Sequence, residues 1–141
     1  MDEAKLQAHG FCTINDTKYP WVFFTFEGTT DDDSKVAAYF DYFSLLLHKD
    51  TSQDLRIMFD LRKFTQGSMT LLQQQREFST DHKSLYRQRL VCTTVVAASP
   101  WTRWAIQVLF AWQKPEMPNR VVSSSRQAVE WMTTQKSMDS I

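Results

Sequence analysis

Short apolar stretches along the chain predict five β-strands. They share β-branched and aromatic side chains and are bounded by turn residues. These stretches are residues 11–15, 21–27, 55–61, 91–98 and 120–122. The first two are separated by the turn-like sequence Asp16-Thr17-Lys18-Tyr19-Pro20 and predict an opening hairpin. In the second stretch both alternating sets of positions are mainly apolar, which predicts an interior strand that is covered on both faces.

Between these strands, apolar residues recur at every third or fourth position, which predicts four helices. The first follows Asp31-Asp32-Asp33 and ends near Lys49, and the others span residues 68–89, 100–112 and 124–132. Strands that alternate with helices favour a parallel sheet with right-handed crossovers. We therefore expect an α/β fold with a mostly parallel five-stranded sheet, an N-terminal hairpin and four flanking helices. The runs at residues 55–61 and 91–98 should be adjacent and parallel.

Length and charge narrow the domain organisation and the partners. The 141 residues, 43% of them hydrophobic, fit one domain over residues 1–141, with polar tails at residues 1–8 and 134–141. Sixteen basic and sixteen acidic side chains cancel, so the charge excess that binds nucleic acid is absent. No run approaches about 18 consecutive apolar residues, and the N-terminus has no basic segment followed by an apolar core. We expect a cytoplasmic protein that does not span a membrane.

The most unusual stretch is the predicted helix at residues 100–112, because it is apolar on two sides. At 100° per residue, one face carries Ile106, Leu109 and Phe110, which suffice to pack on a sheet. The opposite face carries the four residues that we expect to form an interface or an apolar-ligand site: Trp101, Trp104, Val108 and Trp112. A second copy of the chain, another protein or an apolar molecule could cover this face, and so could the last helix through Trp131.

Residues capable of chemistry are present but do not form a catalytic or metal-binding set. Cys12 and Cys92 are isolated in apolar stretches, which is typical of buried free thiols. Asp60 ends a strand and is expected to cap a turn or to pair with Arg62. His82 lies on an apolar helical stripe, where hydrogen bonding to the backbone is the expected role. We expect no catalytic residue, no metal and no cofactor.

The octapeptide Ile57-Met58-Phe59-Asp60-Leu61-Arg62-Lys63-Phe64 is followed by a helix, by the strand at residues 91–97, and by the closing segment at residues 121–132. This order resembles the SpoIIAA-like or STAS-like proteins over most of the chain. The resemblance implies a small non-enzymatic domain that acts by binding partners. In the anti-sigma-factor antagonists, a serine at the start of the helix after the Asp-Leu strand is phosphorylated. Here Ser68 and Thr65 match that serine by position only, since the Asp-Ser pair is absent.

Three hypotheses for the function follow. The first is a regulatory or protein-interaction module that self-associates, as a homodimer, through the tryptophan face. The second is a carrier of an apolar, lipid-like ligand, because the SpoIIAA-like group also resembles the lipid-binding lobe of CRAL-TRIO proteins. The third is an enzyme that uses Asp60 and His82.

Overall fold

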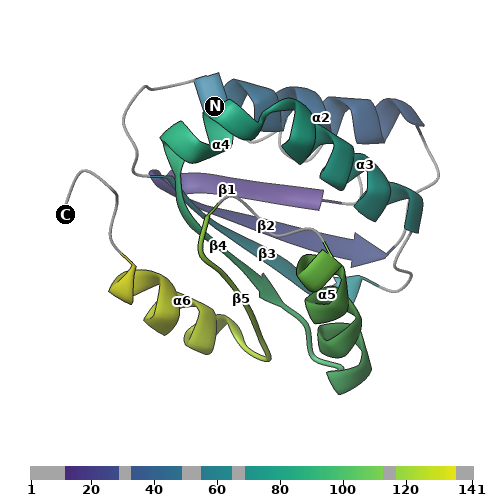
Figure 1. The fold of residues 1–141 in the computed structure, drawn as a ribbon, viewed down its shortest axis with the longest axis vertical. Helices are drawn as coiled ribbons and strands as arrows, with labels where there is room; N and C mark the ends of the chain where they lie inside the picture. Colours follow the sequence, from purple (N-terminus) through teal and green to yellow (C-terminus); the bar gives the residue numbers. More distant parts are fainter. Residues whose placement is uncertain (1–11, 29–32, 49–54, 65–68, 113–116, 136–141) are drawn as a thin grey trace.

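The computed structural model describes residues 12–28, 33–48, 55–64, 69–112 and 117–135 (Figure 1). The described strands are β1 (Cys12–Lys18), β2 (Trp21–Gly28), β3 (Leu55–Phe64), β4 (Leu90–Val96) and β5 (Asn119–Val122). The described helices are α2 (Asp33–His48), α3 (Met69–Asp81), α4 (Lys83–Arg89), α5 (Pro100–Trp112) and α6 (Ser125–Thr134). None of the described helices is long and apolar enough to cross a membrane.

The strands form one sheet in the order β1-β2-β3-β4-β5. β1 and β2 are antiparallel, and the other three pairs of neighbours are parallel. The hairpin, the interior position of β2 and the parallel pairing of β3 with β4 confirm the predictions from sequence. Val22 and Phe24 of β2 are fully buried on one face, while Phe23 on the other face is half-buried. β2 thus has a neighbouring strand on each side, and its apolar side chains pack on both faces of the sheet.

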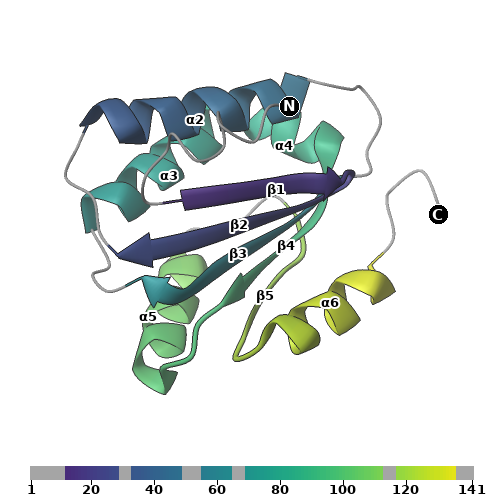
Figure 2. The ribbon, with the colours of Figure 1, turned by 180° about the vertical axis from the view of Figure 1, so that it is seen from behind.

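Helices cover the two faces of the sheet unequally. Side chains alternate along β3, so Ile57 and Phe59 point to one face and Met58 to the other. Ile57 and Phe59 pack in clusters with residues of α2, α4 and α5, whereas Met58 packs with Ala128 and Met132 of α6. Right-handed crossovers between strands added in one direction place their helices on a single face. Figures 1 and 2 show α2, α3 and α4 grouped together, with α6 apart from them.

The core under α2 is largely aromatic. Phe24 lies 5.1 Å from Phe59 and 5.3 Å from Phe43, measured between ring centroids. Phe43 in turn lies 5.2 Å from Phe78, which joins α3 to the same cluster. Large rings at these separations bury much apolar area and fix the helices to β2 and β3.

The predicted helix at residues 68–89 is wrong in one respect, because the structure divides it at His82. This residue has φ −110° and ψ 23°, outside the helical region, and α4 begins at the next residue. Its backbone N–H and its ring nitrogen Nδ1 both lie within hydrogen-bond distance of the Phe78 carbonyl oxygen, at 3.0 and 2.9 Å. The ring contact is therefore made in addition to the helical bond of the His82 N–H, and α3 ends because the backbone angles of His82 leave the helical region. The described part of the chain consequently holds α3 and α4 in place of one long helix.

Candidate functional site

The N-terminal half of α5 presents two indole rings to solvent. Trp101 is 71% exposed and Trp104 is 54% exposed. Their ring centroids lie 5.1 Å apart with an interplanar angle of 28°, so the two rings stack on each other. Ile106 on the opposite side is only 6% exposed, which confirms that this face packs on the sheet. The side chains of Val108 and Trp112, predicted to extend the tryptophan face, lie outside the described residues.

Polar contacts hold the start of α5 against the end of β4. Arg103 donates hydrogen bonds to the carbonyl oxygens of Ala97 at 2.8 Å and Ala98 at 2.7 Å. Its own backbone N–H donates to the carbonyl oxygen of Ser99 at 3.0 Å. Pro100 opens the helix, where its fixed φ is favourable and its missing N–H has no partner to lose. The two tryptophans are therefore displayed on a helix whose position is set by the sheet.

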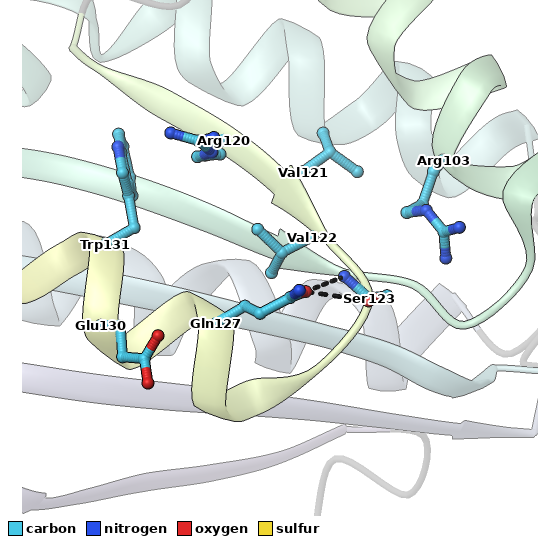
Figure 3. Close-up of a pocket in the computed structure, with 8 residues that line it drawn as sticks. All are labelled: Arg103, Arg120, Val121, Val122, Ser123, Gln127, Glu130 and Trp131. Carbon is cyan, nitrogen blue, oxygen red and sulfur yellow. Dashed lines mark hydrogen bonds between the residues drawn. The ribbon is translucent and has the colours of Figure 1, made fainter.

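The last helix does not cover these tryptophans. Trp131 of α6 packs instead with the cluster that contains Met58 and Met132, on the opposite face of the sheet. It also lines a hollow of about 540 Å³ beside β5, together with Arg120 and Gln127 (Figure 3). The expectation that Trp131 shields the α5 indoles is wrong, because α5 and α6 lie on different faces.

Two hollows flank the outer side of β5, and their linings are mainly polar. The larger one also includes Arg103 and Glu130, and the smaller one, of about 320 Å³, includes Gln107 and Asn119. Arg120 and Val121 line both hollows. Sequence reasoning assigned residues 120–122 to a strand but did not find this site. The sequence feature at this site is an arginine beside two valines in the last strand. It indicates a site only once the strand order places this strand at the edge of the described sheet.

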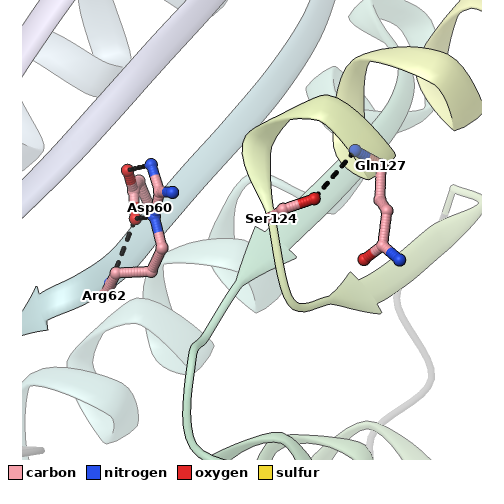
Figure 4. A network of polar contacts seen from close by, with 4 residues as sticks. All are labelled: Asp60, Arg62, Ser124 and Gln127. Carbon is pink, nitrogen blue, oxygen red and sulfur yellow. Dashed lines mark hydrogen bonds and ion pairs between the residues drawn. The ribbon is translucent and has the colours of Figure 1, made fainter.

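Asp60 and Arg62 form a two-point ion pair on β3 (Figure 4). Arg62 donates from Nε to Oδ1 of Asp60 at 3.0 Å and from a terminal nitrogen to Oδ2 at 2.7 Å. The backbone N–H of Arg62 also donates to Oδ1 at 3.0 Å. Burial alone raises the pKa of Asp60, but these hydrogen bonds and the charges of Arg62 and Lys63 outweigh it and lower the pKa. The predicted pairing with Arg62 is confirmed, whereas the alternative role as a turn cap is wrong, because Asp60 lies inside β3, which continues to Phe64.

His82 is held on the other face of the sheet. Its ring stacks on Phe78 at 4.0 Å between centroids, and its Nδ1 lies 2.9 Å from the Phe78 carbonyl oxygen. Because a carbonyl only accepts, Nδ1 is the nitrogen that carries a proton. Asp60 shares the face of Met58 and α6, whereas Phe78 packs in the α2 cluster. The structure therefore does not bring Asp60 and His82 together around a common substrate position.

The two cysteines are buried, as expected, and neither is disulfide-bonded. Burial raises the pKa of the Cys92 thiol to about 11, partly offset by the charge of Arg56, and burial also raises the pKa of Cys12. Both thiols therefore stay protonated near neutral pH. Among the residues that the structure describes, no three His, Cys, Asp or Glu side chains are grouped as metal ligands. Thr65 and Ser68, the positional matches to a phosphorylated serine, lie outside the described residues.

No protein-family model matches the chain, and no curated protein matches it. Among solved structures, the chain is similar to an uncharacterized protein of the DUF3478 family from Shewanella loihica PV-4, whose crystal structure has a SpoIIAA-like fold. The two chains are 11% identical with a TM-score of 0.63, over 86% of this chain and 91% of that chain. At this identity the likeness shows the fold alone and carries no information on an activity or a partner. The chain has a SpoIIAA-like fold.

Proposed function

We propose that this protein is a non-enzymatic interaction module that self-associates through the stacked pair Trp101 and Trp104. The observation that carries the proposal is the exposure of both indoles on a helix that buries Ile106 on its opposite side. A tryptophan side chain offers about 150–250 Å² of surface, and adjacent exposed rings on a monomer commonly mark a binding site. Ring stacking also limits side-chain rotation before binding, which lowers the entropic cost of association.

A second copy of the chain suits this patch because a two-fold interface joins identical surfaces. The patch consists of uncharged aromatic rings, so its self-pairing brings no like charges together. Two stacked pairs facing each other would bury four indoles in one cluster. Aromatic residues in such clusters are typical of the positions that dominate binding energy.

The carrier hypothesis has less support from the geometry. The two hollows beside β5 are lined mainly by polar side chains such as Arg120 and Gln127 rather than by an apolar wall. An apolar ligand would be expected in an enclosed, mainly hydrophobic cavity. Native mass spectrometry of the purified protein would reveal a co-purified lipid, and that result would favour the carrier over the interaction module.

The cytoplasmic location and the single-domain organisation expected from the sequence stay predictions.

The test is the molar mass in solution, measured by light scattering during size-exclusion chromatography at several concentrations. The double variant Trp101→Gln, Trp104→Gln should be a folded monomer where the unaltered protein is a dimer. Leu45→Gln is the matched control, because Leu45 is an apolar side chain of α2 that is 57% exposed. It should remain a dimer. A monomeric unaltered protein at high concentration, or a double variant that still dimerises, would reject the proposal.

A further inference from the structure

We propose that the outer edge of β5 binds an extended acidic segment of a partner protein as an added sixth strand. This surface is separate from the Trp101–Trp104 pair, and the inference does not depend on self-association. It rests on the backbone of β5, the hollows beside it and the charge of Arg120.

Among the strands that the structure describes, β5 is the last of the sheet and pairs on one side only, with β4. The N–H of Thr93 donates to the carbonyl oxygen of Pro118 and the N–H of Ala97 to that of Val122, each at 3.0 Å. Alternate residues of a strand direct their backbone groups to opposite sides. The N–H and C=O groups of Asn119 and Val121 therefore point away from β4. An added strand can pair with these groups.

The space beside this edge is bounded by α5 on one face of the sheet and by α6 on the other. The two hollows, of about 540 and 320 Å³, share Arg120 and Val121 and so run along the strand. Figure 3 shows the residues that line the larger one. Directly after β5, the side chain of Gln127 accepts a hydrogen bond from the N–H of Ser123 at 3.1 Å. This N–H is therefore not available to an added strand. The open backbone groups are thus confined to the part of β5 that the hollows flank.

The positive charge of Arg120 along this edge favours an acidic partner segment. Arg120 is exposed, and no ion pair joins it to a carboxylate in the described part of the chain. Glu130, the acidic side chain of the larger hollow, is bound by Arg126 on the same helix at 3.1 Å. An acidic segment gains charge-assisted contacts here, whereas a second copy of β5 would bring another Arg120 beside this one.

The alternation of β5 predicts the pattern of the segment. Val121 packs with the α5 cluster and Val122 with the α6 cluster, so the neighbouring Arg120 projects on the α6 face. An added strand should therefore place carboxylates on the α6 face and β-branched apolar residues on the α5 face. Alternating glutamate and valine satisfies both requirements.

The experiment measures fluorescence anisotropy of a labelled peptide, Thr-Val-Glu-Val-Glu-Val-Thr, titrated with the full chain at low salt. The same peptide with lysine at both glutamate positions is the comparison. We expect the glutamate peptide to bind at least roughly tenfold more tightly, with an advantage that shrinks as salt rises. Equal binding of the two peptides would overturn the choice of an acidic partner.

Matched variants test the edge itself. Val121→Pro removes an N–H that β4 does not use, and Val121→Thr keeps it, so only the proline variant should lose binding, by roughly tenfold or more. Arg120→Gln should weaken binding, while Arg126→Gln, an equal loss of charge at a side chain that is 88% exposed and bound to Glu130, should not. In the unaltered protein, peptide should slow hydrogen exchange of the Val121 amide, a readout that survives if the proline variant fails to fold. Unchanged exchange, or a dimer that Val121→Pro abolishes, would reject peptide addition.

Discussion

The guanidinium of Arg89 lies at the carboxyl end of α2, where its Nε donates a hydrogen bond to the carbonyl oxygen of Leu47 at 3.2 Å. A second nitrogen of the same side chain donates to the hydroxyl of Tyr19, in the turn between β1 and β2. Arg89 is only 1% exposed, yet it belongs to α4. A positive charge at a helix C-terminus is favourable, and here it joins three elements that are distant in sequence.

Replacing Arg89 by methionine should lower the free energy of unfolding by about 3 kcal/mol, because the change leaves buried acceptors without a charged donor. Urea denaturation followed by circular dichroism measures this loss. Arg126→Met is the control, since that exposed pair with Glu130 is worth at most about 1 kcal/mol. Equal stabilities of the two variants would show that Arg89 does not connect these elements.

Ser124 is the N-cap of α6. Its Oγ accepts a hydrogen bond from the N–H of Gln127 at 3.2 Å (Figure 4). Ser124→Ala should cost about 1 kcal/mol of stability, because it leaves an N-terminal N–H of the helix without this acceptor. Ser125→Ala removes the same hydroxyl one residue later and should be nearly neutral. Thermal unfolding of both variants measures the difference.

The fold was predictable because each strand carries its own signal. The two-sided apolar pattern of residues 21–27 indicates an interior strand, and the short apolar runs of β3 and β4 indicate buried parallel neighbours. The break at His82 was not predictable, because the helical apolar pattern runs through it from Phe78 to Leu85. The break shows only in the backbone angles of His82, which leave the helical region.

The candidate sites were predictable only where a single element defines them. Trp101 and Trp104 lie on one helix, so periodicity alone separates their face from that of Ile106. The β5 edge depends on strand order and on which helices flank it, which are properties of the whole sheet. The sequence around Arg120 therefore identifies no site until the strand order is known, and the burial of Arg89 likewise depends on how the elements pack.

The thiol of Cys92 should be unreactive in the folded protein. It is fully buried, and burial raises its pKa from 9.0 to about 11. Iodoacetamide at pH 7.5 should modify neither cysteine in the native state and both in urea, as measured by intact mass. Because the folded state favours the protonated Cys92 thiol, the stability that this thiol contributes is complete below about pH 9. It declines as the pH rises toward the folded-state pKa of about 11. Rapid native modification would contradict the buried placement.

Asp60 should make part of the stability depend on acid pH. Its pKa lies below the ordinary value of 3.8, so the folded state favours the carboxylate more than the unfolded chain does. The resulting stability is present above the unfolded pKa and is lost as the pH falls through the lower, folded pKa.

Asp60→Asn should therefore be less stable than the unaltered protein at pH 7, by about 1 kcal/mol, and the difference should shrink as the pH falls below about 4. Urea denaturation between pH 2.5 and pH 7 measures both quantities. Arg62→Gln should produce a similar loss, and the double variant should lose less than the sum of the two, because both changes remove the same interaction. Asp41→Asn, at an exposed position of α2, serves as the charge control. Additive losses would show that the ion pair between Asp60 and Arg62 does not contribute to stability as a unit.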